Sequence, residues 1–263
     1  MILKDKVAVI YGAGGAIGGA VARAFAAEGA EVHLTGRSCE AVAEVADAIV
    51  DAGGSAETAA VDALDERAIE EHLASVVGRS GRVDISFNAV GVRDTEILGV
   101  PFLELDAEKF ALPVRDYTTS YFLTARLAAR QMLPMKSGVI MTVTSLPARM
   151  GSRLNGGYGT AHAGKEALTR DLSAELAPYG IRVVGLRPHG MPETDTMREV
   201  YDRKADALGI SWEEFGGYIA GSTHRRRAMV VEEVANMAVF VASDKASGMT
   251  GTTVNLTMGS LDD

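Results

Sequence analysis

The chain has 263 residues, of which 47% are hydrophobic and 23% charged, and its formal net charge is −9. Length and composition are typical of a folded globular chain that can bury a sizeable core, rather than of a disordered one. The negative charge disfavours nucleic acid and anionic membranes as partners, and the single Cys39 excludes an internal disulfide and indicates a reducing compartment.

The first residues, MILKDKVAVIYG, lead directly into a strand, without a basic segment followed by an apolar one. The longest uncharged run, residues 7–22, is interrupted by glycines and is too short to span a membrane. We therefore expect a cytoplasmic protein without a membrane segment, and we assign no metal site.

Apolar runs alternate with helical segments along the whole chain. Buried strands are predicted at 6–12, 31–36, 56–62, 83–91, 137–145 and 180–188, with helices between them such as 16–30 and 39–54. Strands rich in Val and Ile that alternate with helices of about a dozen residues indicate βαβ units and a parallel sheet covered on both faces. We predict one doubly wound, Rossmann-like α/β domain over residues 1–263.

A glycine-rich turn, YGAGGAIGGA at residues 11–20, joins the first strand to the first helix. Glycines let the backbone turn tightly and approach a pyrophosphate, and the N-terminus of the helix offers unpaired N–H groups. Such turns also serve plain packing, but the strand–turn–helix context favours a dinucleotide site. We expect Gly12, Gly14, Ile17 and Gly18 to contact the cofactor.

The second strand ends in HLTGRS, where an NAD site would carry an acidic residue for the ribose hydroxyl. Arg37 stands there instead, and a guanidinium can hold a 2′-phosphate through several charge-assisted bonds. The alternative is an ordinary surface arginine. We favour the phosphate role, and hence NADP(H) as the cofactor.

These motifs resemble the short-chain dehydrogenase/reductase family over the full length of the chain. The glycine turn departs from the family pattern at Tyr11 and Ala16, whereas segment 232–256 follows it closely. The resemblance implies that Asp62 contacts adenine, with a helix N-cap as the alternative. It also places Asn88 at the cofactor site, although a role in tying strand ends together is the favoured alternative.

The resemblance further implies a catalytic serine, tyrosine, lysine and asparagine. Ser145 and Tyr158 match, as the pair that polarises and protonates a carbonyl. His162 stands in place of the lysine and, being mostly neutral at pH 7, could bind ribose hydroxyls but would lower the pKa of Tyr158 only when protonated. A core or solvated histidine is the alternative.

Two neighbouring residues complicate the comparison. Lys165 lies nearly two turns after Tyr158, so its amine could reach the site, but a solvated or interface charge is the favoured interpretation. Tyr117 occupies the place of the asparagine, so the usual proton relay is in doubt. We expect Tyr117 to fill space.

The family's loop over the nicotinamide corresponds to RPHGMPET, in which we expect Pro188 and Thr194 to contact the cofactor and His189 marks a departure. Residues 191–227 form the expected substrate lid within the domain. Its aromatic residues suit an apolar or ring-containing substrate, or packing against the core. The basic run HRRR at 224–227 is expected to be solvated or paired with acids rather than to bind an anion.

The sequence therefore predicts an NADP(H)-dependent oxidoreductase acting on a carbonyl/alcohol pair, with Ser145, Tyr158 and His162 at its centre. One alternative is a redox-silent NADP(H)-binding sensor or scaffold. A third hypothesis is other chemistry in the same cleft, such as enoyl reduction or a lyase step. We expect a homodimer or homotetramer, as in the family, and a small-molecule substrate.

Overall fold

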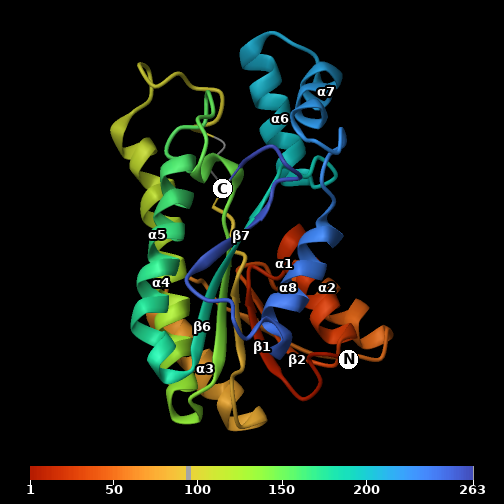
Figure 1. Ribbon diagram of the computed structural model, residues 1–263, viewed down its shortest axis with the longest axis vertical. Helices are drawn as coiled ribbons and strands as arrows, with labels where there is room; N and C mark the ends of the chain where they lie inside the picture. The colour runs from red at the N-terminus through yellow and green to blue at the C-terminus, as the bar shows by residue number, and fades with distance from the viewer. Residues whose placement is uncertain (93–95, 263) are drawn as a thin grey trace.

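The computed structural model describes residues 1–92 and 96–262, and its strands form one seven-stranded sheet in the order β3-β2-β1-β4-β5-β6-β7 (Figure 1). Every neighbouring pair of strands is parallel. The strands are β1 (Val7–Tyr11), β2 (Glu31–Gly36), β3 (Ser55–Ala60), β4 (Ile85–Asn88), β5 (Gly138–Val143), β6 (Ile181–Pro188) and β7 (Thr252–Leu256).

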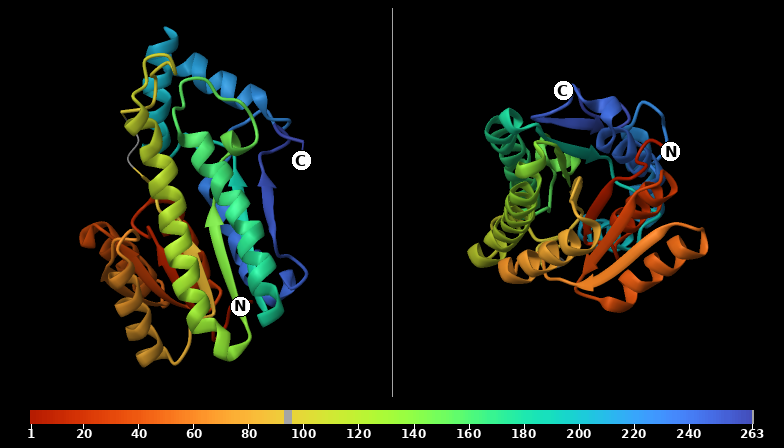
Figure 2. Two further views of the ribbon diagram at one scale, coloured as in Figure 1. Left: turned by 90° about the vertical axis from the view of Figure 1, so that its left-hand side faces the viewer. Right: turned by 90° about the horizontal axis from the view of Figure 1, so that it is seen from below.

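Helices cover both faces of this sheet, as the end-on view in Figure 2 shows. Helices α1, α2 and α8 pack on one face and α3, α4 and α5 on the other, while α6 and α7 lie beyond the carboxyl ends of the strands (Figure 1). Their bounds are α1 (Ala16–Ala27), α2 (Cys39–Asp51), α3 (Glu66–Ser80), α4 (Ala107–Met132), α5 (Tyr158–Leu176), α6 (Asp195–Leu208), α7 (Trp212–Ser222) and α8 (Val231–Ala242).

Burial along the strands explains why their sequences read as continuous apolar runs. All residues of β1 and β5 are buried, because helices cover both faces of a central parallel strand. The edge strand β3, SAETAA, is only partly covered and mixes polar with small residues. The predicted doubly wound architecture is confirmed, and each predicted strand lies within a few residues of the observed one.

The chain reverses its direction of sheet growth between β1 and β4, which pair with each other. Open α/β sheets bind their ligands outside the carboxyl ends of the strands at such a switch point. The glycine turn follows β1 and Asn88 ends β4, so both lie at this point. None of the described helices is long and apolar enough to cross a membrane.

Candidate active site

The glycine turn brings three chain segments into close backbone contact. Gly12 has a φ of +77°, and a Cβ added to it would lie 2.6 Å from the carbonyl oxygen of Ala89. A Cβ on Gly18 would lie 2.3 Å from the carbonyl oxygen of Gly12. Side chains at either position would push the start of α1 away from β1 and β4, so the tight turn requires glycine.

The turn ends in a helix N-terminus that is not capped by any side chain of residues 1–92 and 96–262. Gly15 is the N-cap of α1, and it is exposed together with Gly14 and Ala16. The N–H groups of the first turn of a helix lack intrahelical partners and favour an anion. Ile17, in that turn, is half-buried against the core. These features fit the pyrophosphate of a dinucleotide.

Arg37 lies directly after β2, and only the N-cap Ser38 separates it from Cys39, the first residue of α2. Its side chain is exposed, and it has no ion-pair partner among residues 1–92 and 96–262. The next residue, Ser38, caps α2 by accepting a hydrogen bond from the backbone N–H of Ala41 at 3.4 Å. An exposed guanidinium directly after β2 can meet a phosphate.

The structure corrects one alternative for Asp62 and supports another for Asn88. Asp65, not Asp62, caps α3, and the Asp62 carboxylate accepts from the N–H of Leu64 at 3.0 Å. Asp62 itself stays exposed. Asn88 is buried and its amide donates to the Thr124 hydroxyl at 3.0 Å, so its side chain ties β4 to α4.

Ser145 and Tyr158 come from segments that pack directly on each other. Ser145 is half-buried after β5, at the start of a 3₁₀ turn, and Tyr158 is the half-buried first residue of α5. A Cβ on Gly159 would lie 2.8 Å from the carbonyl oxygen of Pro147, which shows how closely that turn meets α5. A Cβ on Gly157 would lie 2.1 Å from the carbonyl oxygen of Phe110, so α4 approaches the same point.

His162 is buried, and its ring contacts the rings of two tyrosines. Its ring centroid lies 4.3 Å from that of Tyr158 and 4.8 Å from that of Tyr117. Neither ring nitrogen has a hydrogen-bond partner among the described residues. Burial, and secondarily the charge of Lys165, hold the pKa of His162 well below its usual value, so the imidazole is neutral at pH 7. These surroundings argue against His162 as a cation and leave its hydrogen-bonding role as a proposal.

Lys165 is not the solvated charge that the sequence favoured. The side chain is 1% exposed, and its amine donates to the carbonyl oxygen of Val143 at 2.7 Å. The same amine lies 5.6 Å from the ring centroid of Tyr117 and 5.7 Å from that of Tyr121. Burial lowers the pKa of Lys165 to about 7. The lysine side chain is thus buried among α4, α5 and β5, with its amine next to the Tyr117 and Tyr121 rings.

Tyr117 fills the space that the sequence assigned to it. Its ring is 6% exposed and meets Tyr158 edge-on, with centroids 5.9 Å apart. Small side chains would leave this space open between α4 and α5. The rings of Tyr117, Tyr158 and His162 contact one another in edge-on and tilted arrangements, and we call them the aromatic cluster.

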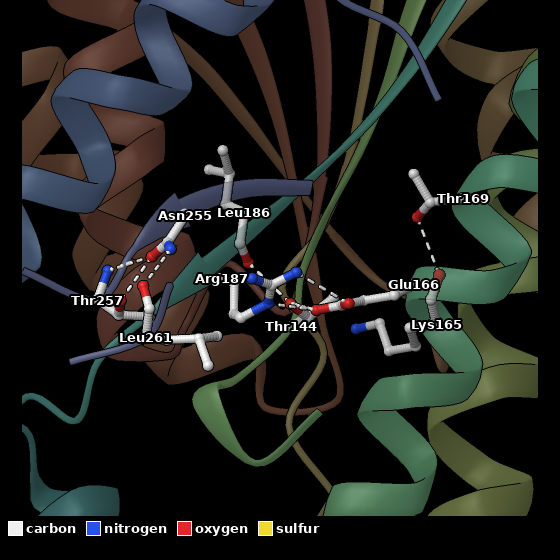
Figure 3. A network of polar contacts seen from close by, with 9 residues as sticks. All are labelled: Thr144, Lys165, Glu166, Thr169, Leu186, Arg187, Asn255, Thr257 and Leu261. Atoms are coloured by element: carbon white, nitrogen blue, oxygen red, sulfur yellow. Dashed lines mark hydrogen bonds and ion pairs between the residues drawn. The ribbon is translucent and has the colours of Figure 1, made fainter. Parts of the chain in front are cut away.

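A buried ion pair between β6 and α5 was missed in the sequence (Figure 3). Arg187 on β6 donates to Glu166 on α5 through Nε at 2.6 Å and through a terminal nitrogen at 3.0 Å. The Thr144 hydroxyl donates to the same carboxylate at 3.1 Å. Both charged side chains are at most 3% exposed. An arginine inside a Val- and Leu-rich strand was the available signal, because a buried charge needs a partner.

The loop after β6 is held by contacts within the protein. His189 is buried, and its Nε2 lies 3.3 Å from the Ser222 hydroxyl at the end of α7. Pro188 is the last residue of β6. The Thr194 hydroxyl accepts from the N–H of Met197 as the N-cap of α6 and donates to the Met191 carbonyl oxygen. Its hydroxyl is therefore engaged in helix capping.

The lid aromatics divide into a packed pair and an exposed pair. Tyr201 and Phe215 are buried against each other, with ring centroids 4.9 Å apart. Trp212 is 37% exposed and Tyr218 is 70% exposed. Packing within the lid therefore accounts for the first pair and leaves the second facing outward.

The basic run 224–227 is partly accounted for by local contacts. Arg227 forms an ion pair with Glu233 at 2.5 Å, and Arg226 donates to the Gly221 carbonyl oxygen at 2.6 Å. The expectation of pairing with a neighbouring acid is confirmed for Arg227.

Comparison with known proteins agrees with the family resemblance found in the sequence. A family model described as "Enoyl-(Acyl carrier protein) reductase" matches residues 12–260. Secoisolariciresinol dehydrogenase from Forsythia intermedia is 32% identical over 254 residues, which are 95% of this chain and 86% of that protein.

Solved structures agree closely in fold. An NAD⁺-bound xylitol dehydrogenase is 27% identical with a TM-score of 0.91, over 97% of this chain and 98% of that one. A variant of actinorhodin polyketide ketoreductase with NADPH is 27% identical with a TM-score of 0.88, over 97% of each chain. The two similar structures thus carry different nicotinamide cofactors.

Proposed function

Because the chain belongs to the short-chain dehydrogenase/reductase family, we propose that it is an NADP(H)-dependent oxidoreductase acting on a carbonyl/alcohol pair. The observation that carries the proposal is the packing of the Ser145 turn on the first turn of α5, which begins with Tyr158, at the edge of the sheet that also bears the glycine turn. The names of its relatives are those of dehydrogenases and reductases.

The glycine turn and Arg37 would hold the cofactor. Gly12, Gly14, Ile17 and Gly18 shape the pyrophosphate cradle, and Arg37 would pair with a 2′-phosphate. Two further supports from the family resemblance, Asp62 for adenine and Pro188 with Thr194 for the nicotinamide, stay predictions. When bound, the nicotinamide supplies or accepts the hydride at the carbonyl carbon.

The chain's own residues handle the oxygen and its proton. The Ser145 hydroxyl would donate to the carbonyl oxygen, which stabilises charge as it develops there. The Tyr158 phenol would give its proton to that oxygen during reduction and take it back during oxidation. The unpaired ring nitrogens of the neutral His162 would exchange hydrogen bonds with ribose hydroxyls, since a neutral imidazole has one donor and one acceptor.

A fluorescence titration with NADPH and NADH, on wild type and Arg37→Ala, tests the cofactor assignment. We expect wild type to bind NADPH more tightly, and Arg37→Ala to weaken NADPH at least about tenfold while leaving NADH nearly unchanged, because only NADPH offers a phosphate to the guanidinium. Arg225→Ala, an exposed arginine outside the cradle, is the control. Equal affinity for both cofactors in wild type would refute the NADP(H) assignment.

Tyr158→Phe tests the chemistry. We expect the rate of ketone reduction to fall at least about 100-fold, because the proton donor is removed, with NADPH affinity little changed. Tyr179→Phe, at a half-exposed tyrosine after α5, should match wild type. Tight NADPH binding without turnover in wild type would instead favour the redox-silent alternative.

The remaining parts of the proposal concern the surroundings of the protein. We propose a small-molecule substrate, a cytoplasmic location and a homodimer or homotetramer. Phe122 on α4 is 40% exposed under the Arg126 guanidinium, so this helix presents an aromatic side chain on its outer face. Sedimentation analysis of the purified protein would determine the assembly.

A further inference from the structure

Tyr201 on α6 carries a buried hydroxyl that has no hydrogen-bond partner among residues 1–92 and 96–262. The residue is 5% exposed, and its ring packs edge-on against Phe215. Phenylalanine would make the same ring contacts. The hydroxyl is therefore the part of this side chain that packing in the lid does not explain.

An unpaired buried hydroxyl has a cost in the folded protein, because it loses water without gaining a partner. Tyr121 shows the usual solution, since its buried hydroxyl lies 3.1 Å from the Thr169 hydroxyl. An unpaired hydroxyl alone does not mark a site, and Tyr11 has one within the apolar cluster beneath α3 and α4. What distinguishes Tyr201 is the place its hydroxyl occupies.

That hydroxyl lies against the loop after β6. A Cβ added to Gly190 would lie 2.0 Å from the Tyr201 oxygen, so only glycine leaves room for the phenol. Gly190 follows Pro188 and His189, in the loop expected to cover the nicotinamide. The lid thus brings a phenol against the loop that is expected to cover the nicotinamide.

Other buried polar atoms, in the loop after β6 and around Tyr158, also lack partners within the described residues. They are Nδ1 of His189, both ring nitrogens of His162, and Nδ2 of Asn155, whose carbonyl oxygen accepts from the Tyr158 N–H. Tyr158 also acts electrostatically on Tyr201: burial and this neighbour raise the pKa of Tyr201 above its usual value. The Tyr201 phenol therefore stays protonated near pH 7 and can donate a hydrogen bond.

We propose that the Tyr201 hydroxyl binds a second oxygen of the substrate, so that the site selects carbonyl compounds with a hydroxyl group near the reacting carbonyl. The inference rests on the proposed oxidoreductase function and refines it, because Tyr158 takes the reacting oxygen and Tyr201 the second one. It also refines the expected substrate: the ring-lined lid can hold an apolar skeleton while the phenol reads one polar group on it.

Paired substrates test this role. Cyclohexanone and the hydroxycyclohexanone with its hydroxyl on the neighbouring carbon are reduced with NADPH by wild type, Tyr201→Phe and the control Tyr218→Phe, an exposed tyrosine in the same lid. We expect wild type and Tyr218→Phe to prefer the hydroxylated ketone at least about tenfold in kcat/KM. Tyr201→Phe should lose about that factor on the hydroxylated ketone and stay within about twofold on cyclohexanone.

Two further measurements separate this inference from the proposed function. Calorimetric titration of each NADP⁺-bound protein with both ketones reports the preference without reduction of the ketone, because the oxidised cofactor has no hydride to transfer. Urea unfolding without ligand should show Tyr201→Phe at least as stable as wild type, because an unpaired hydroxyl has been removed.

Absence of turnover with intact NADPH binding would refute the oxidoreductase proposal, while the binding preference still decides the role of Tyr201. An unchanged preference in Tyr201→Phe, or no preference for the hydroxylated ketone in wild type, would overturn the inference. A clear loss of stability in Tyr201→Phe would also overturn it, since the hydroxyl would then have a structural partner.

Discussion

The glycine turn of residues 11–20 lies at the carboxyl ends of the strands, and α4 and α5 form a layer on one face of the sheet. These two regions depart from the family pattern in different ways. In the turn, Tyr11 and Ala16 replace family residues while the glycines that set the backbone path remain, and their close contacts leave no room for side chains. In the α4–α5 layer, changed residues alter the charge and hydrogen bonding around Tyr158.

The comparison teaches that backbone geometry and side-chain electrostatics tolerate change unequally. A pyrophosphate cradle depends on where backbone N–H groups lie, so two side-chain changes leave it intact. A phenol that moves protons depends on neighbouring charges. In the α4–α5 layer the histidine is neutral, and the buried Lys165, whose pKa is lowered to about 7, donates to the carbonyl oxygen of Val143.

The largest effect expected in this comparison comes from Glu166→Ala. Removing the carboxylate takes from the buried Arg187 guanidinium its two hydrogen bonds to Glu166, which should lower the free energy of unfolding by about 3–5 kcal/mol. Urea unfolding measures it. The control is Glu71→Ala, which breaks the exposed Arg67 pair and should change little. A small effect at Glu166 would mean that the ion pair does not hold α5 to β6.

Lys165→Met tests whether the buried amine costs stability. Its folded pKa of about 7 lies below the ordinary 10.5, so between these values the unfolded chain binds more protons and stability rises with pH. The full cost is present below about pH 7. We expect the variant to gain several kcal/mol at pH 6, and progressively less towards pH 10, in urea unfolding.

The contrary result would be a gain that is the same at every pH, or a loss. Either would show that the amine is paired as a cation within the folded protein. Lys136→Met, at an exposed lysine after α4, is the control for any general effect of removing a positive charge.

Gly18→Ala tests the turn in the same way. The new Cβ would lie 2.3 Å from the Gly12 carbonyl oxygen, so the start of α1 must move. We expect a loss of about 1–3 kcal/mol in unfolding and at least tenfold weaker NADPH binding. Gly78→Ala in α3, where an added Cβ meets nothing within 4 Å, should leave NADPH binding unchanged. Unchanged binding in Gly18→Ala would show that the turn is more yielding than its contacts indicate.

Among the single substitutions, the smallest effect should come from His162→Gln. Because its pKa lies well below the usual value, acidification from pH 8 to pH 6 should not charge it. We expect the pH profile of kcat/KM to be the same in wild type and His162→Gln over this range. A step near pH 7 that persists in His162→Gln and disappears in Lys165→Met would belong to the lysine. A step that disappears in His162→Gln would restore the histidine as the titrating group.

A gain-of-function variant sharpens the same point. His162→Lys combined with Lys165→Met places one ammonium beside Tyr158 and removes the other from the layer, which avoids like-charge repulsion. We expect a several-fold higher rate of ketone reduction than in Lys165→Met alone. No gain would indicate that the aromatic cluster, and not the absence of a cation beside Tyr158, limits the rate of ketone reduction.

The sequence by itself determined the architecture, the glycine turn and the positions of Ser145 and Tyr158. The architecture and the glycine turn follow from local signals, namely apolar runs bounded by glycines, helical spacing, and motifs at strand ends, whereas the resemblance to the family identified Ser145 and Tyr158. The local signals also placed Arg37 after the second strand, and the resemblance led to the expectation that Tyr117 fills space near Tyr158. The structure agrees with both placements.

Only the tertiary structure decided the electrostatics. Whether Lys165 faces solvent or the core, whether His162 is charged, and which cap α3 uses all depend on contacts that helical spacing does not fix. The Arg187–Glu166 pair joins β6 to α5, and the Tyr201 hydroxyl meets Gly190 because α6 lies against the loop that follows β6. Burial sets the protonation of such groups, and burial is a property of the packed molecule rather than of any one segment.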